Sequence, residues 1–132
     1  MSAAVSRAKP CASCPYRRNV PSGVWHPDDY AKLPAYDRDT MDQPANAFMC
    51  HQGDGCVCSG WLAHRGPYDL LAVRIGVMRG NLDASCMDHE TDVPLFESGQ
   101  AAADHGMRDI ENPGAKADAV MGKITRLHEA RP

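Results

Sequence analysis

Five of the six cysteines fall into two tight groups, and this grouping constrains the fold more than any other feature of the sequence. The first group is Cys11 and Cys14, separated by two residues. The second lies much further along the chain and comprises Cys50, Cys56 and Cys58. A C-x2-C pair places two thiolates on one turn, and a distant second group can complete a tetrahedron around one ion. The sequence therefore predicts a metal site that ties two separate segments of the N-terminal half together.

Metal binding is favoured over disulfides by what the N-terminus lacks. Residues 1–7 have no apolar core of the kind found in a secretory signal. No apolar stretch approaches the ~20 residues needed to span a bilayer. We therefore expect a cytoplasmic protein without membrane association, in a compartment where thiols stay reduced and clustered cysteines more often bind metal. A disulfide framework is the disfavoured alternative.

Composition predicts a small domain with many loops. The chain has 132 residues, ten prolines, eleven glycines and only 6% aromatic residues, so a staple would help to stabilise it. We expect a single domain over residues 1–132, with a metal-binding part at residues 10–65 and a helical part at residues 67–130. The predicted fold class is mainly α: an irregular, metal-stapled N-terminal half followed by three to four helices. A small α+β fold is the alternative.

Capping residues and apolar periodicity place the helices. Pro27 and two acidic residues predict a short helix over residues 26–33 that Pro34 ends. The clearest helix follows Pro67 and covers residues 68–79, with an apolar stripe at helical spacing and Gly80 as its end. Ser98 predicts the start of a helix that Gly106 stops. Three further elements are predicted: one or two helical turns at residues 58–64, an extended lead-in at residues 47–50 and a last helix from Asn112 to about Ala130. Loops are predicted at residues 1–25, at residues 35–46 and around Cys86 and His89.

The choice of ligands is partly open from spacing alone. Cys11 and Cys14 have the separation that suits two bonds to one ion. Cys50 and His51 are neighbours whose side chains point apart, so both are not expected to bind the same ion. Cys56 and Cys58 cannot be distinguished by spacing. Zinc is the favoured metal because it prefers four thiolates, while a [4Fe–4S] cluster is the alternative, since Cys14 is followed by proline as in ferredoxin motifs.

Four sequence elements together carry a family resemblance. They are C-A-S-C-P-Y-R at residues 11–17, P-S-G-V-W at 21–25, F-M-C-H at 48–51 and C-S-G-W-L at 58–62, followed by A-V-R at 72–74. In this combination the chain resembles a small, uncharacterised family of actinobacterial and phage proteins with the pattern C-x2-C-P, C-H and C-[AS]-G-[WF]. The resemblance covers roughly residues 10–80. It implies that the metal ligands are Cys11, Cys14, Cys50 and Cys58, with Cys56 an extra thiol and His51 beside the site.

A second, partial resemblance keeps a different function open. C-P-Y-R at residues 14–17 and G-V-W at 23–25 are similar to elements of the WhiB-like iron–sulfur transcription regulators. Those proteins place a further cysteine soon after the first element, and this chain has Arg18, Asn19 and Val20 there. The likeness implies a [4Fe–4S] redox-sensing or transcription-regulatory protein as the alternative function.

The favoured function is a non-enzymatic binding or adaptor module. A closed four-cysteine site organises a fold and leaves no open position for catalysis, and the sequence carries no P-loop, nucleophile elbow or H-E-x-x-H motif. A metal-dependent nuclease-like enzyme is a third, weaker reading, from Cys86, Asp88 and His89. A protein partner is expected. The net charge of −3 does not favour nucleic acid, although Arg7, Lys9, Arg17 and Arg18 flank the first cysteine pair.

Overall fold

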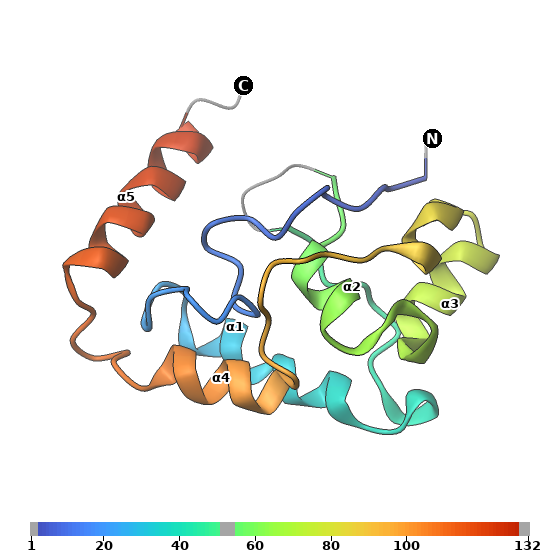
Figure 1. Cartoon of the computed structure of the whole chain (residues 1–132), viewed down its shortest axis with the longest axis horizontal. Coiled ribbons are helices and arrows are strands. Elements are labelled where there is room, and N and C mark those ends of the chain that lie inside the picture. Colours follow the sequence, from blue (N-terminus) through green and yellow to red (C-terminus); the bar gives the residue numbers. More distant parts are fainter. Residues whose placement is uncertain (1–2, 51–54, 130–132) are drawn as a thin grey trace.

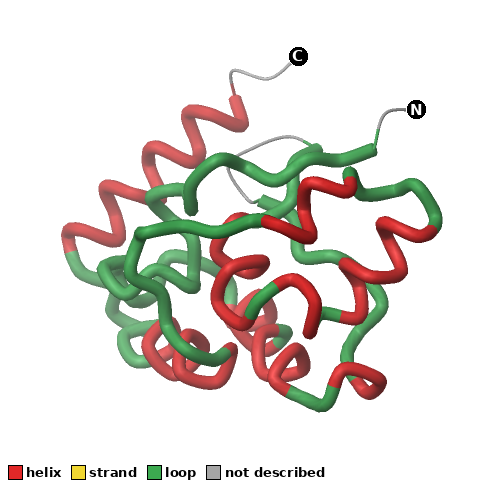
Figure 2. The backbone as a smooth tube through the Cα atoms, turned by 45° about the vertical axis from the view of Figure 1, so that its right-hand side comes forward, coloured by secondary structure: helices red, strands yellow, loops and turns green. Residues whose placement is uncertain are grey.

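Short helices joined by long connections make up the fold (Figures 1 and 2). The computed structural model describes residues 3–50 and 55–129, and within these ranges the chain forms five α-helices, four 3-10 turns and only isolated β-bridges. The α-helices are α1 Pro27–Ala31, α2 Ser59–Arg65, α3 Leu71–Met78, α4 Gly99–Met107 and α5 Ala115–Glu129; the 3-10 turns are η1 Leu33–Asp37, η2 Thr40–Asp42, η3 Pro67–Asp69 and η4 Ala84–Asp88. The predicted mainly helical class is confirmed. Among the described helices, none has the length and apolar character that a bilayer crossing requires.

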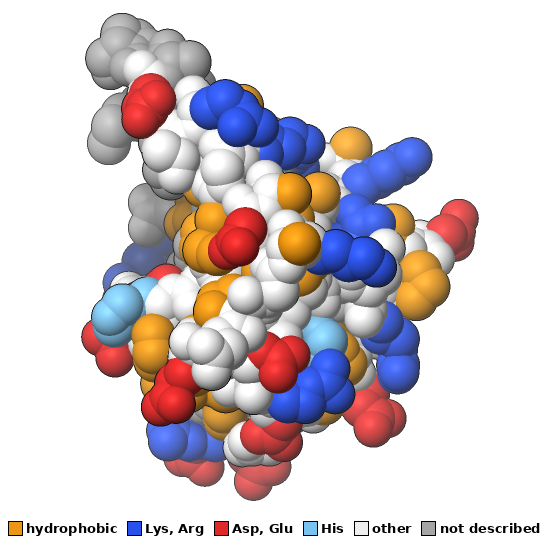
Figure 3. Space-filling model, turned by 90° about the vertical axis from the view of Figure 1, so that its left-hand side faces the viewer, with side chains coloured by type: hydrophobic (Ala, Val, Ile, Leu, Met, Phe, Trp, Pro, Cys, Tyr) orange, Lys and Arg blue, Asp and Glu red, His pale blue; other side chains and the backbone are white. Residues whose placement is uncertain are grey.

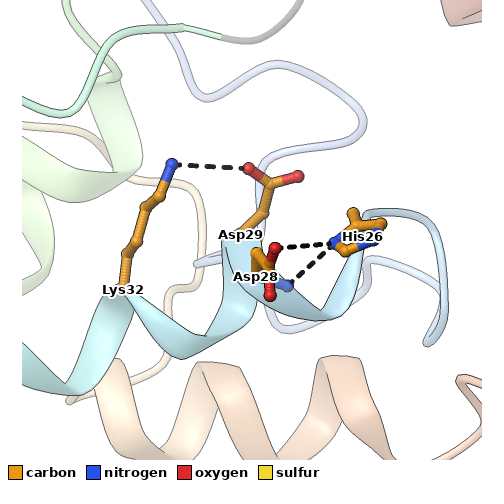
Figure 4. A network of polar contacts seen from close by, with 4 residues as sticks. All are labelled: His26, Asp28, Asp29 and Lys32. Atoms are coloured by element: carbon orange, nitrogen blue, oxygen red, sulfur yellow. Dashed lines mark hydrogen bonds and ion pairs between the residues drawn. The ribbon is translucent and has the colours of Figure 1, made fainter.

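The first helix begins where the sequence predicts. The side chain of His26 caps α1, because its Nδ1 accepts a hydrogen bond from the backbone N–H of Asp28 at 3.1 Å (Figure 4). An Nδ1 that accepts this bond carries no proton, so the 3.5 Å approach of the Asp28 carboxylate is not a second, simultaneous ion pair. Pro34 was predicted to end the helix, but it lies within η1. Residues 35–46 were predicted as loop, but they contain η2.

The helix predicted over residues 68–79 is divided in two. Pro67–Asp69 form η3, Leu70 is extended, and α3 begins at Leu71, whose N–H donates to the side-chain oxygen of Gln43 at 3.0 Å. This cap comes from a distant segment, so local sequence could not reveal it. Not every apolar side chain of α3 is buried: Met78, at the end of the helix, is 86% exposed. Gly80, with a φ of +79°, ends the helix as predicted.

The fourth helix runs through its predicted stop. Ser98 caps α4 as expected, by accepting from the N–H of Ala101 at 3.0 Å. Gly106 lies inside the helix instead of ending it, because a Cβ there would overlap the ring of Tyr30 on α1. The glycine therefore permits the close packing of α4 on α1, which lie side by side in Figure 1.

The last helix stands at one end of the molecule (Figure 1). It begins at Ala115, two residues after Pro113, and its end at Glu129 agrees with the prediction to within a residue. Ala117 and Ile124 are its buried residues, and they form a small apolar cluster with Val24. Leu127, predicted on the buried face, is 39% exposed.

A larger core surrounds α2 and the first half of the chain. Trp61 and Leu62 of α2 are fully buried, as is Val57 just before them. Val57 also forms two bridges, antiparallel to Met49 and parallel to Ser6. The two cysteine groups therefore lie together in the core. The largest fully buried side chains there are Tyr16, Leu33, Val57, Trp61, Leu62, Leu70 and Val73.

Candidate metal centre

The first cysteine pair lies on a turn. The N–H of Cys14 donates to the carbonyl of Cys11 at 3.0 Å, and the N–H of Arg17 donates to the carbonyl of Cys14 at 3.1 Å. These bonds form two consecutive turns, at residues 11–14 and 14–17. Both thiols are buried, at 6% and 1% exposure. The C-x2-C spacing therefore does locally what the sequence predicts: it presents two sulfurs to the interior.

The second group is carried by an antiparallel pairing. Around the Met49–Val57 bridge, the N–H of Cys50 donates to the carbonyl of Cys56, and the N–H of Cys58 donates to the carbonyl of Phe48, both at 2.9 Å. Cys50 and Cys56 are thus opposite each other. Because side chains alternate along a strand, Cys50, Cys56 and Cys58 share the face opposite to that of Met49 and Val57. His51 lies outside the described residues.

The pair Cys14 and Cys58 joins the two groups. Their Sγ atoms are 3.7 Å apart, across 44 residues of sequence. Cys58 is also the residue that caps α2, and its sulfur accepts from the N–H of Trp61 at 3.4 Å. Gly60 makes the approach of these segments sterically feasible, because a Cβ at this position would overlap the Cys14 sulfur.

Cys11 and Cys50 form a second pair of neighbouring thiols, since the interaction with Cys50 is the largest cause of the raised pKa of Cys11. The guanidinium of Arg7 donates to the Cys50 sulfur at 3.8 Å, and the hydroxyl of Ser13 lies 3.5 Å from the Cys11 sulfur. Both groups stabilise negative charge on sulfur. The thiol cluster is thus lined by one positive side chain and two polar donors, Ser13 and the N–H of Trp61.

Hydrogen bonding and burial divide the thiols into donors and acceptors. The pKa of Cys14 is lowered, chiefly because Cys58 donates to it, and the same bond followed by burial raises the pKa of Cys58. The hydrogen bond with Cys50, together with burial, raises the pKa of Cys11. Of these three thiols, Cys14 is the one whose pKa is lowered. A metal ion that binds here must displace protons from its partners, so its affinity rises with pH.

The two remaining cysteines occupy different surroundings. Cys56 is partly exposed and lies beside Cys50, where burial and the neighbouring thiol raise its pKa. Cys86 is fully buried in η4 as part of the core, and its sulfur donates to the carbonyl of Ala4 at 3.8 Å. His89 contacts the start of α2, because its Nε2 is 2.6 Å from the hydroxyl of Ser59.

The cysteines of the N-terminal half are neighbours and could bind a metal. They lie as two pairs, and within residues 3–50 and 55–129 no three Cys, His, Asp or Glu side chains already surround a common centre. The two pairs interact electrostatically, since Cys14 raises the pKa of Cys11, and Cys11 raises that of Cys58. Sequence reasoning did not find the contact of Arg7 with Cys50 or the steric role of Gly60. The glycine of the C-S-G-W motif was the sequence signal that could have indicated the steric role of Gly60.

The chain that carries this cluster matches a known family over most of its length. A family model matches residues 6–131. The chain belongs to DUF6283, a family of unknown function. The match includes every described cysteine and the five α-helices of the described residues. No curated protein and no solved structure matches the chain.

Proposed function

We propose that this DUF6283 protein is a small zinc-binding module in which Cys11, Cys14, Cys50 and Cys58 hold one structural ion, and that it acts as a non-enzymatic binding or adaptor protein. The observation that carries the proposal is the 3.7 Å separation of the Cys14 and Cys58 sulfurs. With Zn–S bonds of about 2.3 Å, the sulfurs of a tetrahedral site lie about 3.8 Å apart. Two of the four ligands therefore already have the spacing that zinc requires.

The spacing favours a single ion over an iron–sulfur cluster. In a [4Fe–4S] cluster each cysteine binds a different iron, so the sulfurs are separated by the width of the cluster as well as by their own bonds. A pair at 3.7 Å would have to move apart to accept it. A single ion asks only that the pair formed by Cys11 and Cys50 approach the pair formed by Cys14 and Cys58.

Burial supports a structural role for the ion. None of the four proposed ligands is more than 8% exposed. Four protein ligands fill a tetrahedral zinc site, and a catalytic zinc needs a position open to water or substrate. The bound ion would join the turn at residues 11–14, the pairing at residues 50–58 and the start of α2. Its contribution is to the stability of the surface that the protein presents to a partner.

Metal analysis tests the identity of the ion. The protein is purified under nitrogen, and its metal content and visible spectrum are recorded. The proposal expects about one zinc per chain and a colourless protein. A brown protein that contains iron and bleaches in air would overturn it in favour of the iron–sulfur redox or regulatory alternative.

Serine variants test the ligand set. Cys58→Ser should lose zinc and melt at a lower temperature, because a hydroxyl replaces a buried thiolate ligand. Cys56→Ser should keep its zinc. Cys86→Ser is the matched control for burial, since it also places a hydroxyl at a fully buried thiol position, and it should lose stability but not zinc. Loss of zinc from Cys56→Ser with retention in Cys58→Ser would refute the proposed set.

A further inference from the structure

A recess opens on the surface next to Cys11. Its volume is about 510 Å³, and its walls are the N-terminal segment 7–12 and one residue of α5, Lys123. Three of the seven lining residues, Arg7, Lys9 and Lys123, are cationic, and none is acidic. The chain has a net charge of −3, whereas the residues that line this recess carry a positive charge. Clefts lined by one sign of charge concentrate the opposite ion.

These three cations have no carboxylate partner within the part of the chain that the structure describes. The ion pair found there joins Lys32 to Asp29, at the end of α1. Arg7 donates to the sulfur of Cys50, and no ion pair engages Lys9 or Lys123. Lys9 and Lys123 are exposed. Their charge is therefore available to a ligand instead of being used to stabilise the fold.

The positive charge continues beyond the recess. On α5, Lys116, Lys123 and Arg126 are separated by seven and three residues, which places them along one side of the helix, and all three are exposed. At a rise of 1.5 Å per residue they cover about 15 Å of helix axis. In the view onto the end of the molecule that carries α5, Lys and Arg side chains gather over the upper right, while most acidic side chains lie lower (Figure 3). A row of this length suits a linear polyanion better than a single small anion.

Two hydrogen bonds hold the segment that lines the recess. The N–H of Arg7 donates to the carbonyl of Val57 at 3.1 Å, and the guanidinium of Arg17 donates to the carbonyl of Pro10 at 3.1 Å. Cys11 is a member of the thiol cluster. The backbone that presents Arg7 and Lys9 is therefore fixed before any ligand arrives, which lowers the entropic cost of binding.

We infer that this basic recess and the adjoining side of α5 bind the phosphodiester backbone of a nucleic acid, without reading its sequence. The remaining lining residues are Ala8, Pro10, Cys11 and Ala12. They offer neither an aromatic surface for stacking bases nor the Trp, Tyr or Met anchors that concentrate binding energy at protein interfaces. Lysine and arginine contacts to phosphates supply affinity and position but carry no sequence information.

This inference rests on the proposed function as a binding module and names its partner. It stands apart from the identity of the metal, because the recess cations bind phosphate whichever ion the thiols hold. Failure of the zinc measurements with nucleic-acid binding intact would therefore refute only the metal proposal. Correct zinc content without nucleic-acid binding would refute only the partner.

Binding to labelled duplex DNA of about 20 base pairs, followed by fluorescence anisotropy between about 50 and 200 mM salt, tests the inference. The test variant is Lys9→Gln with Lys123→Gln, which leaves Arg7 and the thiol cluster intact. The control is Arg74→Gln with Arg79→Gln, which removes the same charge from exposed positions on α3 and its end, at the other end of the molecule (Figure 1). Circular dichroism checks that both variants fold.

We expect the wild type and the α3 control to bind with equal affinity and the same steep salt dependence. Each lost lysine–phosphate contact should reduce the slope of log K against log salt by about 0.9, and the affinity at 0.1 M salt by about eightfold. Absence of binding at the lowest salt, or equal losses in the two double variants, would overturn the inference. Tighter binding of a labelled poly-glutamate peptide would overturn it too, and would indicate an acidic protein partner.

Discussion

Replacing Gly60 with alanine tests whether the thiol cluster depends on the close approach of α2. A Cβ at Gly60 would lie well inside 3.0 Å of the Cys14 sulfur and 3.1 Å from the Cβ of Tyr16. Neither neighbour can retreat, because both are fully or almost fully buried and the Cys14 sulfur already has Cys58 at 3.7 Å behind it. The methyl group must displace the turn that carries the first cysteine pair.

The expected cost follows from two opposing terms. Overpacking a filled core costs about 1–3 kcal/mol of unfolding free energy. Alanine in place of glycine in a helix returns up to about 1 kcal/mol. Because the overlap with the Cys14 sulfur is deep, the upper part of the overpacking range applies, about 2–3 kcal/mol, and the net loss is about 1–2 kcal/mol. The metal affinity should fall with it because Cys14 moves away from Cys58.

Gly122→Ala is the matched control. Gly122 also lies in a helix, but a Cβ there meets only the guanidinium end of Arg126 at 3.4 Å, and that side chain can move. This variant should gain about 0.5–1 kcal/mol. Urea unfolding followed by circular dichroism, together with zinc analysis of each protein, gives both quantities. The packing argument fails if Gly60→Ala is as stable as the wild type with its zinc content unchanged, or if the two alanine variants shift in the same direction.

Two further predictions concern the surroundings of the cluster. Burial lowers the pKa of His64 below 6.5, so the unfolded chain takes up a proton that the folded protein refuses, and the free energy of unfolding should fall as the pH drops through 6.5. His64→Phe should flatten that part of the pH profile in urea unfolding, and an unchanged profile would contradict it. Asp37 accepts from the N–H groups of Gly99 and Gln100 at 2.6 and 2.8 Å, so Asp37→Ala should cost about 1–2 kcal/mol in thermal unfolding. Asp37→Asn should recover part of this cost, and no recovery would indicate that charge alone is involved.

Local signals predicted those helix boundaries that depend on neighbouring residues, and missed those set by contacts with distant segments. Pro27 and Ser98 marked true starts, because caps depend on the residues immediately around them. Gly106 was wrongly predicted as a stop, since its small size serves packing against Tyr30 and not termination. The division of the helix at Leu70 was missed because the cap of α3 is supplied by Gln43 from another part of the chain. Such contacts leave no trace in the periodicity of the segment they shape.

The sequence alone established that two cysteine groups stand in spacings suited to a metal, since the C-x2-C turn is a local geometry. Spacing could not separate Cys56 from Cys58, because strand alternation places both on one face, and only the family resemblance favoured Cys58. Their environments differ only in the folded chain, where Cys58 is buried against Cys14 while Cys56 is partly exposed beside Cys50. The basic recess near Cys11 also emerged only there. A net charge of −3 is a sum over the chain, and folding brings Lys123 of α5 beside Arg7 and Lys9, more than a hundred residues away in sequence.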